Sequence, residues 1–389
     1  MALEVISSTS AASDRAARWL ADWDGQGTHR TATAGDHAGA EWLAVEARAL
    51  GADAVIEEFA LDRLDPVATF LEIGDKRIAA VPVFDAPPTS AGGVTGRLGV
   101  AGSGAPIIVA ELSPRTVYSG EFERLRRTGE QTGFVVVCVG EQPGMGLINA
   151  ESFRRPYGAP AIHIASEAGD IVLAAAQAGA EARLVADSRR TPAQGRNVVA
   201  VLGGDLARPP LVVMTPRSSW WHSTAERGGG IVCWLETLRA LVAMPMTRPV
   251  VLTANSGHEL NHLGLDDFVE RRPGWDRAAA DGGALWVHYG ANIGAAGGNL
   301  SVMSADDALR DLATAELSRQ GQSFATTAKN IVPSGETRDI HRTGGRYLTL
   351  VGTNPLFHLP QDRWPHSIDL PAVIRCAAAA ARIVTTLAG

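Results

Sequence analysis

The sequence predicts an α/β protein: a mixed, mostly parallel central sheet flanked by helices, with a β-rich domain inserted into it. Three observations predict this fold class. From residue 197 onward, near-continuous apolar runs alternate with helical segments, as in a sheet that is buried on both faces. Between about residues 62 and 190, short β-branched runs are separated by Gly and Pro. The 389 residues are enough for two or three domains with a substantial core.

The first 60 residues predict two helices and a strand. Residues 11–24 and 36–50 carry apolar side chains at helical spacing, and Gly51 is a stop signal before the strand-like segment AVIEEFAL. The expected insert contains the strands RIAAVPVF, PIIVAEL, GFVVVCVG and APAIHIA and the helix GDIVLAAAQAGA. We therefore expect the first part of the main domain at 1–60, the insert at 61–192, and the rest of the main domain at 193–389.

The main domain continues as strands and helices in long units. Its segments are NVVAVLGG, PPLVVMTP, GGGIVCWLETLRALVAM, RPVVLTAN, ALWVHYGA, RYLTLVG and PAVIRCAAAAARIVTTL. Ligands of such sheets bind beyond the carboxyl ends of the strands, so the residues that follow each apolar run are the candidates for function. Histidines gather there: His222, His258, His262, His288 and His358, with His341 just before another strand.

Composition excludes several classes of function. The formal charge is −7, and no basic stripe is present, which argues against nucleic acid as a partner. The segment MALEVISSTSAASDRAARWL lacks the pattern of an export leader, and no uncharged apolar stretch has the length of a membrane span. Cys138, Cys233 and Cys376 lie far apart in apolar runs, which predicts buried free thiols in a reducing cytoplasm. The expected partner is a small-molecule substrate, and a homo-oligomer stays open.

The segment His258-Glu259-Leu260-Asn261-His262 matches the HExxH pattern of zinc-binding helices. That pattern requires both histidines on one face of a helix. Here a strand is expected to end only a few residues upstream, and Ser256-Gly257 indicates a turn. The sequence therefore argues against a zinc-binding helix at this point.

A different alignment accounts for more of the chain. PRSSW begins at Pro216, Glu226 is followed by RGGG, GHELNHLGLDDF begins at Gly257, HYG ends at Gly290, and PLFH ends at His358. In order and spacing these segments resemble the di-zinc aminopeptidase and glutamate carboxypeptidase family. The resemblance implies a zinc-exopeptidase fold of the phosphorylase/hydrolase-like type, and residues 60–190 resemble the protease-associated domain that this family often carries.

The resemblance also implies that the metal site is degraded. One zinc of the family would be held at the positions of Pro216, Glu226 and Gly290, two of which offer no ligating side chain. The other would be held by Glu226, Glu259 and His358, all of which can ligate. His258 stands in the position of the general base, and Ser218 in that of the Asp that orients a ligand. We expect one zinc ion at Glu226, Glu259 and His358, or none.

Three functions remain open. The first is a hydrolase of an amide or peptide-like carbon–nitrogen bond in a small, carboxylate-bearing substrate. The second is a metal-free acid–base enzyme, and the third a non-catalytic binding protein on the same scaffold. The expected catalytic residues are His258, Glu259, Glu226 and His358, and the expected substrate contacts are Arg217, Ser218, Trp220, Trp221, His222, Arg338 and His341. Structural roles compete with these: Glu226 and Glu259 as helix-capping carboxylates, His262 and His288 as hydrogen-bonded core residues.

Overall fold

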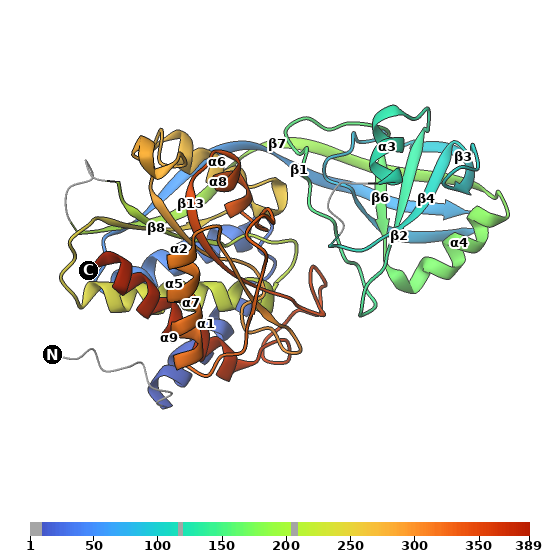
Figure 1. Ribbon diagram of the computed structural model, residues 1–389. Coiled ribbons are helices and arrows are strands. Elements are labelled where there is room, and N and C mark those ends of the chain that lie inside the picture. The colour runs from blue at the N-terminus through green and yellow to red at the C-terminus, as the bar shows by residue number, and fades with distance from the viewer. Residues whose placement is uncertain (1–9, 116–119, 204–208) are drawn as a thin grey trace.

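The computed structural model describes residues 10–115, 120–203 and 209–389. It contains two bodies joined by two long antiparallel strands, β1 (Ala54–Ile73) and β7 (Glu181–Leu202), which run from one body into the other (Figure 1). The expected insert boundaries at residues 61 and 192 fall inside these two strands.

The larger body is built on the main part of the sheet, in the order β1-β7-β9-β8-β10-β13-β11-β12. The strands β9, β8, β10 and β13 are parallel to one another, whereas β7 and β11 run antiparallel to their neighbours β9 and β13. This confirms the expected mixed, mostly parallel sheet. The bounds are β8 Leu211–Pro216, β9 Val250–Asn255, β10 Leu285–Tyr289, β11 Leu300–Met303, β12 Ala325–Thr326 and β13 Arg346–Gly352.

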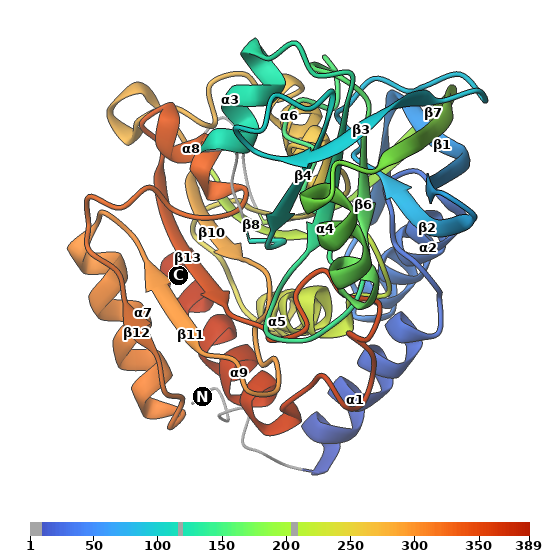
Figure 2. The ribbon, with the colours of Figure 1, turned by 90° about the vertical axis from the view of Figure 1, so that its right-hand side faces the viewer.

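Helices cover both faces of this sheet (Figures 1 and 2). One face packs into the largest hydrophobic cluster with five helices: α1 Ser10–Asp24, α2 Ala34–Ala49, α5 Gly229–Val242, α7 Asp307–Arg319 and α9 Leu370–Ala388. The other face packs against α6 (Leu263–Glu270) and α8 (Thr337–Arg342). Alternation along a strand explains the two faces, since Val213 of β8 belongs to the first cluster and its neighbour Val212 to the second.

The insert is a smaller body with its own hydrophobic clusters. Its strands are ordered β2-β6-β5-β4-β3, and β3 returns to β7. The bounds are β2 Lys76–Pro82, β3 Val94–Val100, β4 Ile107–Leu112, α3 Glu121–Thr128, β5 Gly133–Cys138, β6 Ala161–Ile164 and α4 Gly169–Gln177.

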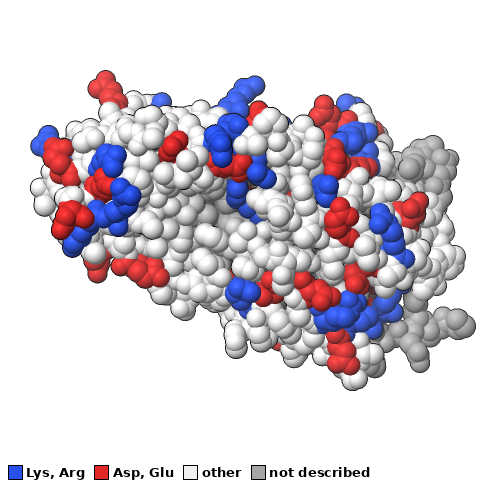
Figure 3. Space-filling model, turned by 180° about the vertical axis from the view of Figure 1, so that it is seen from behind, with Lys and Arg blue, Asp and Glu red and all other residues white. Residues whose placement is uncertain are grey.

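The surface charge and the hydropathy of the last helix were compared with what a nucleic-acid or membrane partner would require. On the face seen in Figure 3, acidic and basic side chains are interspersed rather than gathered by sign. Within the described ranges, α9 is the one helix long and apolar enough to cross a membrane, but 56% of its apolar window is buried inside the protein. It packs against α1, α5 and α7, as the core helix of a globular domain does.

Candidate functional site

A cleft of about 420 Å³ lies between the insert and the carboxyl ends of β10 and β13. Loops of the insert contribute Pro114, Arg115, Asn149 and Glu151 to one wall, and the larger body contributes the loops that follow β9, β10 and β13. Three of the six histidines singled out from the sequence line it: His258, His262 and His288. We call this space the histidine cleft.

The histidines of the cleft are held by two carboxylates from α8 and the residue just before it. Nδ1 of His258 lies 2.7 Å from Oε1 of Glu336, and Nε2 of His288 lies 3.0 Å from the other oxygen, Oε2. Nδ1 of His262 bonds to Asp339. An ionised carboxylate only accepts hydrogen bonds, so each of these ring nitrogens carries the proton. For His258 and His262, Nε2 is therefore the nitrogen left to act on a ligand.

Burial and charge set the protonation of this group. Burial and the positive charge of Arg227 lower the pKa of His258 to about 4, although Glu336 opposes them. Burial also acts to lower the pKa of His262, but the bond to Asp339 and the charge of Glu336 outweigh it and raise the pKa. The same histidines keep the pKa of Glu336 well below its usual value against the effect of burial. At neutral pH, His258 is a neutral imidazole beside an ionised carboxylate.

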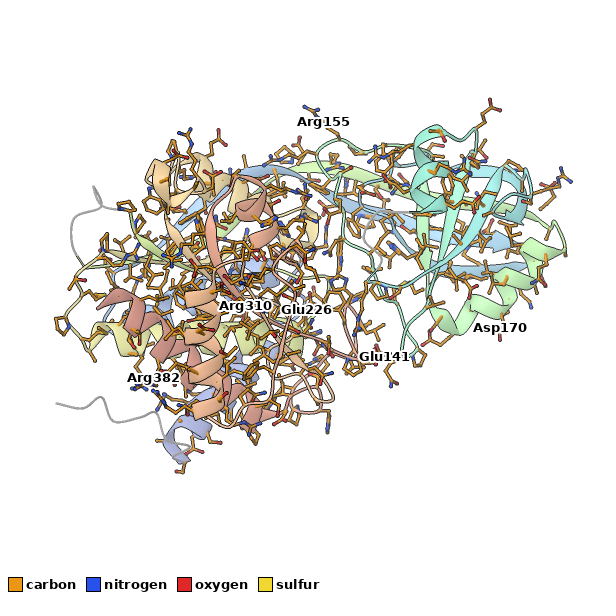
Figure 4. The ribbon with its side chains drawn as sticks, in the orientation of Figure 1. Glu141, Arg155, Asp170, Glu226, Arg310 and Arg382 are labelled. Atoms are coloured by element: carbon orange, nitrogen blue, oxygen red, sulfur yellow. The ribbon has the colours of Figure 1, made fainter. Side chains whose placement is uncertain are left out.

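Glu226, Arg227 and His358 form a second buried group of charged side chains. Glu226, in the π-helical turn Thr224–Gly228, lies inside the larger body (Figure 4). Its Oε1 is 2.6 Å from Nη2 of Arg227 and 3.3 Å from Nε2 of His358. Burial would raise the pKa of Glu226, but the charges of Arg227 and His358 lower it to about 2. Nδ1 of His358 donates to the carbonyl of Leu147, which fixes this imidazole against the insert.

Both carboxylate oxygens of Glu259 accept hydrogen bonds from neighbouring residues. Its Oε1 accepts hydrogen bonds from the backbone N–H and the hydroxyl of Thr31, both at 2.7 Å, and its Oε2 accepts one from Ser218 at 2.6 Å. The same Ser218 hydroxyl accepts bonds from the backbone N–H groups of Gly257 and His258. Glu259 and Ser218 are both fully buried. Their hydrogen bonds hold the loop that carries His258.

The three residues expected to hold one zinc ion therefore do not form one donor cluster. Glu226 and His358 are together, but Arg227 places a cation against the carboxylate where a metal would sit, and Glu259 has both oxygens occupied. Over the described parts of the chain, the one group of three potential ligands whose donor atoms lie within 4.8 Å of each other is His258, His262 and Glu336. The structure thus brings Glu226 and His358 together and gives Glu259 other partners, whereas the donor atoms of His258, His262 and Glu336 are close enough to share one ion.

Several expected substrate contacts lie elsewhere. Arg217 is fully buried and pairs with Asp36 at 2.9 Å, so it supports the loop after β8 and does not face a substrate. Trp220 is buried against Phe84, with ring centroids 4.6 Å apart, in a hydrophobic cluster between the two bodies. Neither side chain lines the histidine cleft, because each has its partner inside the protein.

Of the remaining expected contacts, Arg338 lines the cleft and the others have partners elsewhere. Trp221 donates from Nε1 to the carbonyl of His358, and the backbone carbonyl of His222 accepts bonds from Trp23 and His29. His341 contacts the hydroxyl of Tyr347 and does not line the cleft. Arg338 does line it, paired with Glu151 of the insert at 2.9 Å.

Sequence reasoning missed Glu336 and Asp339, and it favoured structural roles for His262 and His288. The available signal was the histidine count at the strand ends, which included both of these histidines. The two carboxylates follow a Pro-Ser-Gly turn before α8 and match no motif. Their role appears only when α8 is packed against the loop after β9.

Comparison with known proteins places the fold. No family model matches the sequence, and no curated protein sequence matches it. Solved structures do. A zinc aminopeptidase from Bacillus subtilis superposes with a TM-score of 0.78 at 16% identity, covering 97% of this chain and 95% of its own. An aminopeptidase from Aneurinibacillus sp. strain AM-1 and a peptidase M28 precursor from Shewanella amazonensis both give 0.71 at 14% identity. Each alignment covers 97% of this chain. It covers 94% of the Aneurinibacillus chain and 96% of the Shewanella chain. The chain therefore shares the fold of these three proteins along nearly its whole length.

Proposed function

We propose that the protein is a hydrolase that cleaves a carbon–nitrogen bond of amide type in a small, peptide-like substrate, and that the reaction takes place in the histidine cleft. One observation carries this proposal: two imidazoles that line the cleft, those of His258 and His262, each have Nδ1 held by a carboxylate. In His258, whose pKa is lowered, the protonated Nδ1 leaves a lone pair on Nε2, the arrangement that activates water for attack on a carbonyl carbon. The fold shared with aminopeptidases supports the same class of reaction.

The chain's own residues supply the rest of the site. Glu336 fixes the tautomer and the orientation of His258, and it also holds His288, so these rings lose little freedom when a substrate arrives. Arg115 brings positive charge to the cleft from the insert, and Arg338 brings it from α8. Arg338 is paired with Glu151 at 2.9 Å and its side chain is 15% exposed, whereas Arg115 pairs with the exposed Glu141 at 3.5 Å and is itself 45% exposed. Arg115 is thus our candidate for binding a substrate carboxylate.

The size of the cleft limits the substrate. A volume of about 420 Å³ matches a compound of a few amino-acid units rather than a folded protein. Three buried free thiols, Cys138, Cys233 and Cys376, fit a reducing compartment, so we propose a cytoplasmic location.

The test is a hydrolysis assay on aminoacyl anilides, dipeptides and N-acyl amino acids, with the wild-type chain and two variants. His258→Ala should lower kcat/KM by at least about 100-fold, the lower range for loss of a water-activating group. His366→Ala, at an exposed histidine, is the matched control and should leave kcat/KM unchanged. Turnover that survives His258→Ala, or that is absent for all three substrate classes, contradicts the proposal.

A second candidate, isomerisation or elimination by proton transfer, is favoured by one contact. The single carboxylate of Glu336 bridges His258 and His288, which gives a hydrogen-bonded chain able to pass a proton between two imidazoles. Solvent deuterium incorporated at carbon without loss of an amide bond would identify this reaction in the same substrate panel.

A further inference from the structure

We propose that His258 and His262, which line the histidine cleft, form with the buried Glu336 behind them a site for one divalent cation of the zinc class. This inference deepens the proposed hydrolase function and rests on it for its biological meaning. One donor atom of each residue lies within 4.8 Å of the other two, and all three side chains are buried. Two imidazoles and one carboxylate, with an open side for water, are a donor set of catalytic zinc sites.

The backbone brings the two imidazoles together in an unusual way. His258 belongs to a short 3-10 turn (His258–Leu260), and α6 begins only at Leu263, so the two histidines do not share an α-helix. Instead Asn261 and His262 both adopt left-handed conformations, with φ of 61° and 59°. The chain thereby turns back, and the two rings lie with centroids 5.1 Å apart. Consecutive non-glycine residues in this region are strained, and such strain is concentrated at ligand sites.

The surroundings of the three residues are those of a metal centre. Asp339 holds Nδ1 of His262, which directs the lone pair of Nε2 away from that carboxylate. His288 holds Oε2 of Glu336, and this leaves Oε1, now 2.7 Å from Nδ1 of His258, as the oxygen that can exchange its hydrogen bond for an ion. With the ion bound, His258 would be a ligand through Nδ1, and its role as the water-activating base applies to the protein without an ion. Carboxylates and imidazoles that orient metal ligands in this manner set both ring tautomer and affinity.

The site differs from the position implied by the family resemblance. There, Glu226 and His358 share their space with the Arg227 guanidinium, which already supplies a positive charge. The cluster in the cleft contains two carboxylates, Glu336 and Asp339, and the rim cation Arg338 is paired with Glu151. A bound cation would polarise the substrate carbonyl and lower the pKa of its water.

The test uses the full-length chain, stripped of metal and titrated with Zn²⁺ by calorimetry and with Co²⁺ by absorption spectroscopy. We expect one ion per chain, with Co²⁺ bands of a nitrogen- and oxygen-ligated centre. His262→Ala and Glu336→Gln should each weaken binding by more than about 100-fold, and Asp339→Asn by about 10- to 100-fold. His341→Ala, on the same helix but outside the cleft, is the matched control and should bind as the wild type does.

Two outcomes overturn the inference. One is that the wild-type chain binds neither ion. The other is that binding survives His262→Ala and is lost in Glu226→Gln, which would place the ion beside Arg227. Thermal unfolding of each variant separates loss of the site from loss of the fold. Binding of one ion without any hydrolysis would support the metal site and contradict the proposed hydrolase function. Hydrolysis that resists a chelator, in a chain that binds no ion, would support the hydrolase function and contradict the metal site.

Discussion

Nη2 of Arg227 lies 2.6 Å from Oε1 of Glu226, and both side chains are fully buried. The two residues are adjacent in sequence, so the charge pair is formed within a single helical turn. His358 approaches the same oxygen from a loop more than a hundred residues away. In a fold shared with zinc aminopeptidases, this part of the molecule thus contains a cation supplied by the chain itself.

The buried pair leads to a prediction about stability. Arg227→Met should lower the free energy of unfolding by about 3–5 kcal/mol, because it leaves the Glu226 carboxylate buried without its partner. Combining it with Glu226→Gln should recover much of that loss. Urea unfolding of the two single variants and the double variant, treated as a double-mutant cycle, measures the coupling. Additive losses in the double variant would show that the pair does not act as a unit.

The Ser218 hydroxyl gives a prediction about the position of His258. Ser218→Ala removes a donor to Glu259 and the acceptor for two backbone N–H groups, those of Gly257 and His258. Leaving buried polar groups without partners should cost about 1–3 kcal/mol. It should also weaken Zn²⁺ binding, because the loop that carries His258 loses its anchor. The Ser219 hydroxyl donates to the carbonyl of Trp221 at 3.1 Å, so Ser219→Ala is the neighbouring control for unfolding and metal titration.

Much of this fold follows from local sequence pattern. Apolar runs such as LVVMTP and VVLTAN became the buried parallel strands β8 and β9, and the histidines that follow such runs lie where the strand ends converge. Periodicity records which face of an element is buried, and the order of the runs records topology. For the same reason, the sequence pattern predicts the helix that follows Glu226 and the last helix of the chain.

The pairing of side chains could not be predicted in this way. Arg217 is paired with Asp36, 181 positions earlier, and no local spacing indicates such a partner. The HELNH segment does not form a zinc-binding helix, yet left-handed residues at Asn261 and His262 still bring its two rings together. Glu336 belongs to no motif and acquires its role only through tertiary packing.

The buried position of Trp220 predicts a structural effect where the sequence suggested a substrate contact. Trp220→Ala should lower the free energy of unfolding by about 3–5 kcal/mol, because it empties a packed cluster that includes Phe84. Trp220→Phe should cost less, since it keeps most of the ring volume. Chemical denaturation measures the cost, and KM for any identified substrate should change little in Trp220→Phe. A KM that rises steeply in this conservative variant would indicate that Trp220 contacts the substrate.

His163 predicts how stability depends on pH. Its Nδ1 donates to the carbonyl of Pro82, and its Nε2 accepts from the N–H of Ile148. Burial lowers the pKa of His163 to about 4, from 6.5 in the unfolded chain. The unfolded state therefore binds a proton more readily, so the stabilising contribution is fully present above pH 6.5 and is lost as the pH falls toward 4.

The test for His163 compares slopes rather than absolute stabilities. In the wild-type chain, this one group should add up to about 1.4 kcal/mol per pH unit to the fall in unfolding free energy between pH 6.5 and 4. His163→Gln keeps a donor and an acceptor but does not titrate, so its slope should be shallower by that amount, whatever its stability at pH 7. His366→Gln, at an exposed position, should retain the wild-type slope. Equal slopes for all three proteins would mean that His163 is not held neutral by the fold.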